Sequence, residues 1–286
     1  MKVAIVGSYN FHLECIGFLL EINNNDDIDI YLEKRSDKYN WLEHYLSIYH
    51  FQVIYDNFHR DIMNNYDKVF KLSANDKCLN DKKIISILHK HGGRGESEKF
   101  ISLTPYVTGN NIYYMFPIYR PILIDNSKLS KNVILIGHYT NNDFDNDTIQ
   151  FINNNINYNF NFILWGSNSY PNLYNLKNVK VLSNVKANDM IKLINNSKFI
   201  LSKKKIKYDR LSGQLALAIS FEKPLIVDVK TKTTYNLPSI VFNKNYSEVG
   251  NLDDVSDEKY DSLINEIKSL KNNIIDNNKK TLKLML

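Results

Sequence analysis

The chain has 286 residues, of which 43% are hydrophobic and 23% charged, and this composition excludes a largely disordered protein. The formal net charge is +5, but 36 basic residues are interspersed with 31 acidic ones, so we expect no nucleic-acid partner. Neither a signal-type N-terminus nor a membrane-spanning run of about 18 apolar residues occurs, so we predict no transmembrane segment and a cytoplasmic location.

The first half of the chain alternates short apolar runs with helical patterns. A buried-strand run at 3–6, a helix at 11–22 and a strand at 28–32 form one βαβ unit. The pattern predicts further strands at 52–55, 68–72, 100–103 and 112–116, and further helices at 41–49 and 82–89. Such alternation is typical of a parallel sheet with helices on both faces.

A linker interrupts this pattern near the middle of the chain. Pro117 and Pro121 disfavour regular structure, and a polar stretch follows at 125–131. A length of 286 residues is typical of two domains. We therefore predict an N-terminal domain over 1–127 and a C-terminal domain over 128–286.

The second domain repeats the architecture of the first. Its opening strand at 132–137 ends in glycine, as the run at 3–7 does. The pattern then predicts strands at 161–164, 179–182, 199–201 and 225–227, and helices at 143–153, 187–195, 211–221 and 257–270, the last one amphipathic. The expected fold class is α/β, with two Rossmann-like domains whose parallel sheets face a cleft.

The loops after the strands of the second domain are the candidate binding segments, because open parallel sheets bind ligands beyond the carboxyl ends of their strands. The candidate residues in these loops are Gly137, His138, Trp165, Gly166, Asn184, Val185, Arg210, Ser212, Gly213 and Gln214. Ser212 and Gly213 begin a helix whose free N–H groups favour an anion, and Arg210 suits a phosphate. The alternative is that Asp209 or Ser212 caps this helix and Gly213 permits close packing.

A longer motif surrounds this helix start. A polar loop, an amphipathic helix and an apolar strand over 184–201 are followed at 212–227 by SGQLALAISFEKPLIV. The region 132–228 resembles the donor half of GT-B glycosyltransferases, whereas the first domain matches only in architecture. The resemblance implies transfer of a sugar from a nucleotide-sugar of the UDP or GDP type to a glycan or other hydroxyl acceptor, with the turn and helix start holding the donor.

Two positions depart from the family pattern. Leu217 stands where many retaining members carry a glutamate, and Glu222 replaces the usual glycine of the turn. The first departure favours an inverting enzyme or an inactive relative. We also expect a metal-independent reaction with no cofactor, the nucleotide-sugar being a co-substrate. Two other functions stay open: a non-catalytic module that binds a nucleotide or glycan, and a nucleotide-sugar epimerase on the same fold.

An inverting transfer needs a general base near the acceptor hydroxyl, and in this architecture the first domain supplies it. His12 is the first choice, and Glu14 orients it or replaces it; the alternative is that His12 only caps or packs. The other acceptor-side candidates are Gly7, Tyr9, Asn10, His91 and Arg94. The alternative for the glycines at 92 and 93 is that they terminate the helix predicted at 82–89.

Two D-x-D strings, at 27–29 and 143–145, match a motif that binds a divalent cation in another glycosyltransferase fold. The first flanks the start of a strand and the second opens a helix, so we interpret both as solvated faces. Cys15 and Cys78 lack metal-ligand spacing. We therefore predict free thiols and no metal site. Gly7 alone falls short of a dinucleotide fingerprint, which disfavours an NAD-dependent enzyme or a Rossmann methyltransferase.

Overall fold

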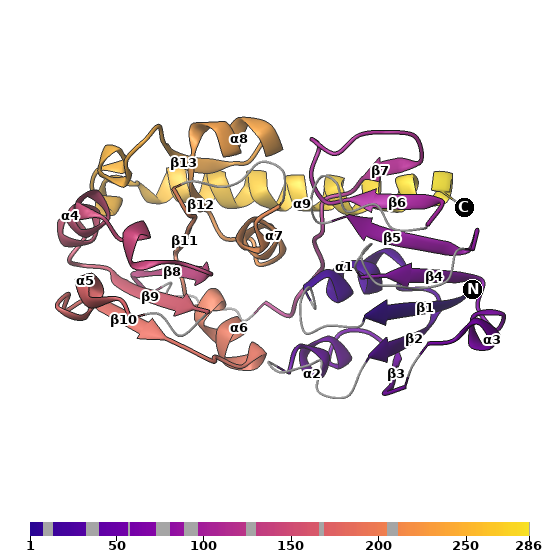
Figure 1. The fold of residues 1–286 in the computed structure, drawn as a ribbon. Coiled ribbons are helices and arrows are strands. Elements are labelled where there is room, and N and C mark those ends of the chain that lie inside the picture. Colours follow the sequence, from indigo (N-terminus) through magenta and orange to yellow (C-terminus); the bar gives the residue numbers. More distant parts are fainter. Residues whose placement is uncertain are drawn as a thin grey trace. The chain divides into compact units, whose positions relative to one another are not determined.

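A computed structural model describes most of the chain (Figure 1). The described residues are 1–7, 14–32, 40–56, 58–72, 81–88, 97–123, 130–165, 169–204 and 211–285, without the side chains of Glu14 and Arg60. They form two compact units. Unit 1 comprises Met1–Pro121, Lys207–Leu211 and Asn272–Leu286, and unit 2 comprises Ile122–Ile206 and Ser212–Lys271.

Unit 1 is built on a seven-stranded sheet in the order β3-β2-β1-β4-β5-β6-β7, and every pair is parallel. Its strands are β1 (Lys2–Gly7), β2 (Asp27–Leu32), β3 (Gln52–Ile54), β4 (Lys68–Lys71), β5 (Ile84–Leu88), β6 (Lys99–Ser102) and β7 (Ile112–Tyr114). Its helices include α1 (Glu14–Ile22), α2 (Trp41–Leu46) and α3 (Arg60–Met63). The strand order reverses direction between β1 and β4, which makes these two strands the switch point of the sheet.

Unit 2 is built on a six-stranded parallel sheet in the order β10-β9-β8-β11-β12-β13, with its switch point between β8 and β11. The strands are β8 (Asn132–Gly137), β9 (Asn159–Leu164), β10 (Val179–Leu182), β11 (Phe199–Leu201), β12 (Leu225–Asp228) and β13 (Ser239–Phe242). The helices are η1 (Asn141–Asp143), α4 (Asn146–Asn154), α5 (Pro171–Tyr174), α6 (Ala187–Asn195), α7 (Gly213–Ser220), α8 (Val229–Tyr235), η2 (Tyr246–Val249) and η3 (Leu252–Asp254). An aromatic core that includes Phe144, Phe160 and Phe162 covers one face of this sheet.

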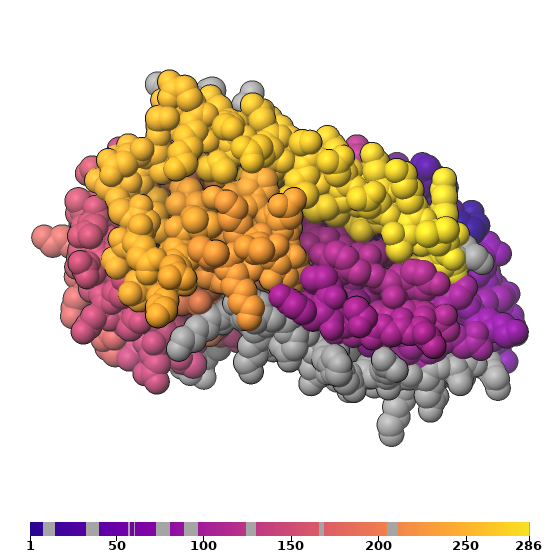
Figure 2. Space-filling model, turned by 90° about the horizontal axis from the view of Figure 1, so that it is seen from above, coloured from indigo at the N-terminus to yellow at the C-terminus, as the bar shows by residue number. Residues whose placement is uncertain are grey.

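The last helix, α9 (Asp257–Met285), contributes to both units. Its residues up to Lys271 belong to unit 2, and those from Asn272 onward belong to unit 1. Figure 2 shows its outer face in yellow. The sequence predicts an end at residue 270 and assigns the whole helix to the second domain, but the helix continues to Met285. No described helix, α9 included, is long and apolar enough to cross a membrane.

Buried polar side chains anchor α9 and explain why its second half escapes prediction. Lys271 donates to the Ser220 carbonyl oxygen at 2.7 Å, and Asn278 donates to the Phe116 carbonyl oxygen at 2.8 Å. Glu21 of α1, only 3% exposed, lies 3.6 Å from the ammonium of Lys279. Because Lys271 and Asn278 occupy inward-facing positions, they interrupt the apolar repeat that identifies an amphipathic helix.

The α/β prediction with parallel sheets is confirmed, and the ends of the predicted strands shift by up to two residues. One element is wrong: 82–89 is not a helix but contains strand β5. A continuous apolar run cannot be assigned by periodicity, and its isoleucines fit a strand buried on both faces. The glycines at 92 and 93 lie outside the described residues, and the helix they were expected to terminate is absent from residues 82–88. The sequence pattern also missed β13, α3, α5 and α8.

Candidate functional site

The switch point of the second sheet is where two neighbouring strands stop pairing. The register between β8 and β11 ends at Ile134 and Ile200, although β8 continues to Gly137. β11 keeps its pairing with β12 through Leu201. Beyond Ile200, the carboxyl end of β11 thus has no ladder partner on its β8 side, and open parallel sheets bind ligands at this kind of position.

Gln214, in the first turn of α7, links these two strand ends. Its Nε2 donates to the carbonyl oxygen of Leu201 at 3.2 Å and to the hydroxyl of Tyr139 at 3.0 Å. The side chain is 5% exposed. Burial raises the pKa of Tyr139, so its hydroxyl stays protonated. Gln214, a predicted donor-binding residue, therefore holds the start of α7 against β8 and β11 through its amide.

The start of α7 has no side-chain cap. Ser212 occupies the N-cap position, but its side chain makes no capping hydrogen bond. Gly213 is the first helical residue and is exposed. Capping by the Ser212 side chain is therefore not what defines this helix start. Helix starts of this kind present N–H groups and a positive dipole end to an anion.

Aromatic side chains follow the neighbouring strand ends. Gly137 ends β8 with φ of 144°, a conformation that residues with a side chain rarely adopt. His138 comes next, and its ring meets that of Trp165 edge to face with centroids 5.5 Å apart. Trp165 also donates its backbone N–H to the Gly137 carbonyl oxygen at 2.9 Å. The structure thus brings Gly137, His138 and Trp165 together at the ends of β8 and β9.

Asn184 and Val185 follow β10 at the edge of the same sheet. Asn184 is exposed and has a left-handed backbone with φ of 53°. In the sheet order, β9 and β8 separate β10 from β11. The structure therefore does not group Asn184 and Val185 with the residues at the switch point.

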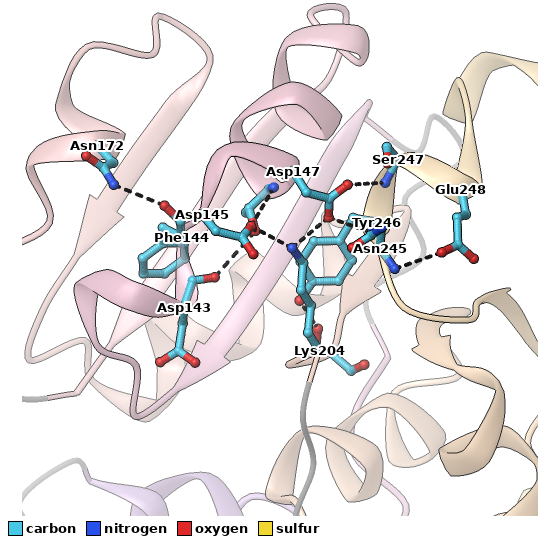
Figure 3. Close-up of polar contacts among 12 residues, drawn as sticks. Asp143, Phe144, Asp145, Asp147, Asn172, Lys204, Asn245, Tyr246, Ser247 and Glu248 are labelled. Carbon is cyan, nitrogen blue, oxygen red and sulfur yellow. Dashed lines mark hydrogen bonds and ion pairs between the residues drawn. The ribbon is translucent and has the colours of Figure 1, made fainter.

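Sequence reasoning missed Lys203 and Lys204, which follow β11 after Ser202. Lys203 Nζ lies 2.9 Å from Asp143 Oδ2 and 5.0 Å from the centroid of the Tyr139 ring. Lys204 Nζ lies 2.6 Å from carboxylate oxygens of both Asp145 and Asp147 (Figure 3). We call Asp143, Asp145, Asp147, Lys203 and Lys204 the acid–lysine cluster. The available signal was a run of three lysines at 203–205, one residue after an apolar strand.

The acid–lysine cluster explains the second D-x-D string. Asp145 caps α4 by accepting from the Thr148 N–H at 3.0 Å, which confirms that the string opens a helix. Burial alone raises the pKa of Asp143 and Asp145, but hydrogen bonds from Thr140, Thr148 and the lysines outweigh it and hold both below the usual value. Asp145 is half exposed, as a solvated face implies, whereas Asp143 is partly buried, and both carboxylates are paired with lysines.

The first D-x-D string has a structural role as well. Asp27 is the first residue of β2, as the sequence indicates. Asp29 is buried and accepts a hydrogen bond from the Tyr66 hydroxyl at 2.5 Å. The Lys2 ammonium lies 3.6 Å from the same carboxylate. Asp29 is therefore not part of a solvated face.

The acceptor-side predictions fall mostly outside the described residues. The residues outside the described part are His12, Tyr9, Asn10, His91 and Arg94. Two donor-side candidates, Gly166 and Arg210, also lie outside it. Glu14 is the first residue of α1. Gly7 is buried at the end of β1, where a Cβ atom would lie 2.7 Å from Leu72 Cδ1 and 3.0 Å from Leu32 Cδ2. Gly7 thus permits two leucines to pack against the strand.

The two departures from the family motif are visible in unit 2. Leu217 is buried in the middle of α7. Glu222 follows α7 with a left-handed φ of 56°, the conformation that favours the usual glycine. Its carboxylate accepts a hydrogen bond from Lys271 Nζ at 2.8 Å. The glutamate therefore anchors α9 at this turn.

No protein-family model and no curated protein matches the sequence, but solved structures match the fold. AviGT4, a glycosyltransferase involved in avilamycin A biosynthesis, aligns over 100% of this chain and 98% of its own with 10% identity and a TM-score of 0.58. The glycosyltransferase VinC, solved with DTDP, aligns over 100% and 99% with 9% identity and a TM-score of 0.55. A UDP-N-acetylglucosamine 2-epimerase aligns over 93% and 90% with 9% identity and a TM-score of 0.52.

These similarities define the class of fold. The chain is an α/β protein with two Rossmann-like sheets and has the GT-B fold of these glycosyltransferases. The resemblance found in the sequence motif is thereby confirmed for the fold.

Proposed function

We propose that the protein is a glycosyltransferase that moves a sugar from a nucleotide-sugar to a hydroxyl acceptor with inversion and without a metal. The observation that carries this proposal is the exposed, side-chain-uncapped start of α7 at the switch point of a GT-B fold. A helix start in this position suits the diphosphate of a UDP, GDP or dTDP sugar.

In the donor half, the backbone N–H groups at Ser212 and Gly213 bind the diphosphate, and Arg210 neutralises part of its charge. Gln214 keeps this turn in place through Leu201 and Tyr139. The rings of His138 and Trp165, with Gly137 and Gly166, line the path of the base or sugar, because partly exposed aromatic rings stack on such groups. Asn184 and Val185 bound the far side.

In the acceptor half, His12 takes the proton of the attacking hydroxyl, with Glu14 as its orienting partner or substitute. The acceptor oxygen bonds to the anomeric carbon while the bond from that carbon to the diphosphate oxygen breaks. The charge that develops on the diphosphate is stabilised by the α7 start. Gly7, Tyr9, Asn10, His91 and Arg94 lie around the acceptor in this assignment.

A screen of nucleotide-sugars tests the proposal. Thermal shift and turnover are measured over UDP-, GDP- and dTDP-sugars, with and without a chelator. We expect stabilisation by one nucleoside diphosphate and transfer that is insensitive to chelation. If no nucleotide stabilises the protein, the assignment of a donor site is wrong.

Two substitutions test the division of roles. Arg210→Ala should weaken donor binding by about tenfold, the effect of one charge-assisted contact. His12→Ala should leave donor binding nearly intact but lower turnover by about 100-fold or more. Binding and turnover are measured by calorimetry and a product assay. The opposite pattern would refute both roles.

An epimerase is the second candidate, because the fold also aligns with a UDP-N-acetylglucosamine 2-epimerase. The two activities differ in their need for an acceptor. An epimerase converts the nucleotide-sugar alone into its epimer, whereas the transferase leaves that sugar unchanged without an acceptor. A protein that binds nucleotide but does neither, and does not hydrolyse the donor, is the non-catalytic module that Leu217 allows.

A further inference from the structure

The two lysines after β11 are engaged to different extents. Lys204 has 13% side-chain exposure, and its ammonium contacts two carboxylates at 2.6 Å each. Lys203 is 32% exposed and contacts a single described carboxylate, that of Asp143, at 2.9 Å. An ammonium carries several N–H donors, so Lys203 retains the capacity to bind a second anion.

Lys203 also lies next to the residues that fix the start of α7. Its ammonium lies 5.0 Å from the centroid of the Tyr139 ring, and the hydroxyl of that ring accepts a hydrogen bond from Gln214. Gln214 is the second residue of α7 and also bonds to the Leu201 carbonyl oxygen. One short chain of contacts therefore connects Lys203 to the first turn of the helix.

Ser202 provides a second and independent observation. Its side chain is completely buried, and its hydroxyl has no hydrogen-bond partner among the described residues. Phe199 and Leu201 of β11 face the aromatic core, so strand alternation turns Ser202 toward the other face. α7 contacts β8 and contributes no residue to that core, so it packs on the face toward which Ser202 points. A buried hydroxyl without a partner is unfavourable unless a ligand or water supplies one.

We propose that Lys203 and Ser202 bind the diphosphate of the donor, Lys203 by exchanging Asp143 for a phosphate oxygen and Ser202 by donating its hydroxyl proton in a hydrogen bond. This inference rests on the proposed nucleotide-sugar site. Asp143 keeps the ammonium in position in the absence of donor, and an incoming diphosphate of higher charge displaces it. Lys204 keeps a structural role, because its ammonium is already paired with two aspartates.

Calorimetry with the full chain tests the exchange. The probe is whichever of UDP, GDP and dTDP stabilises the wild-type protein most. Lys203→Met should weaken its binding by about tenfold, whereas Lys203→Arg should stay within about threefold of wild type. Ser202→Ala should weaken binding by about threefold without lowering the melting temperature, because it removes an unpartnered hydroxyl.

Lys204→Met is the matched control. It should lower the melting temperature but leave the affinity within about threefold of wild type, since the described contacts of the Lys204 ammonium, with two carboxylates and the Tyr246 ring, lie within unit 2. Asp143→Asn should tighten binding because it removes the competing carboxylate. Unchanged affinity in Lys203→Met, or weaker binding in Asp143→Asn, would overturn the exchange. If no nucleoside diphosphate binds the wild-type chain, the proposed function fails and this inference falls with it.

Discussion

The switch points of the two sheets have the same topology but different chemistry. In unit 1, β4 pairs with β1 up to its last residue, Lys71, opposite Val6, and the Leu72 N–H donates to the Val6 carbonyl oxygen at 2.9 Å. The Leu72 side chain then packs against Gly7. In unit 2, β8 and β11 stop pairing at Ile134 and Ile200, and polar side chains follow.

This difference separates what the fold provides from what the residues add. At the unit 1 switch point, Leu72 packs against Gly7, and the one charged group at the described strand ends is the buried Lys71 of β4. The switch point of unit 2 has an amide, a hydroxyl and an ammonium directly at the strand ends, supplied by Gln214, Ser202 and Lys203. The same topology therefore supports a polar site only where the sequence supplies these groups.

The largest expected effect comes from removing the Gln214 bridge. Gln214→Leu leaves the Tyr139 hydroxyl and the Leu201 carbonyl oxygen buried without this donor, and should lower the free energy of unfolding of unit 2 by about 3 kcal/mol. Urea unfolding followed by Trp165 fluorescence in a Trp41→Phe background measures it. Ser212→Ala is the control, because the Ser212 side chain makes no capping hydrogen bond. This substitution should change the free energy of unfolding by no more than about 0.5 kcal/mol. Equal effects would show that the bridge is unimportant.

Lowering the pH should reduce the stability of unit 1 before that of unit 2. His44 of α2 is buried among aromatic rings, its Nε2 has no described hydrogen-bond partner, and burial lowers its pKa from 6.5 to about 4. The unfolded chain therefore binds a proton below pH 6.5 that the folded chain rejects, so stability falls as the pH drops toward 4. The loss should reach about 2 kcal/mol at pH 5. In unit 2, the lowered pKa values of Asp143, Asp145 and Asp147 preserve their stabilisation until the pH falls below the ordinary value of 3.8.

Unfolding at pH 7 and pH 5, followed by Trp41 fluorescence in a Trp165→Phe background, measures this loss. His44→Phe should remove most of the pH dependence between these values. The exposed His50, six residues further along, is the matched control, and His50→Gln should leave the dependence in place. A slope that survives in His44→Phe would place the responsible group elsewhere.

The smallest expected effect contrasts two glycines, one at each switch point. Gly7→Ala forces Leu72 and Leu32 to move and should destabilise unit 1 by about 1–2 kcal/mol. Gly213→Ala lies at an exposed first helical position, so its effect on stability should stay within about 0.5 kcal/mol. Thermal unfolding of both variants decides the comparison. If Gly7→Ala is neutral, the unit 1 switch point is more open than its packing indicates.

Local sequence patterns were sufficient for most of the architecture. Strand runs such as 132–137 and 225–227, the helix at 187–195 and the helix start at Gly213 all follow from apolar periodicity and turn residues within a few positions. The closing helix was predicted only where its inward positions were apolar. The order of the strands, and with it the location of both switch points, was not contained in any local pattern.

The sequence by itself determined that this is a parallel α/β chain with a candidate anion site at Ser212 and Gly213. Only the tertiary structure decided that residues 84–88 form a strand, that Gln214 joins two strand ends, and that Lys203 and Lys204 meet aspartates some 60 positions earlier in the chain. The physical reason is that each of these features depends on pairing or hydrogen bonding between distant segments. Polar side chains acquire a role only when folding brings their partners within a few ångströms.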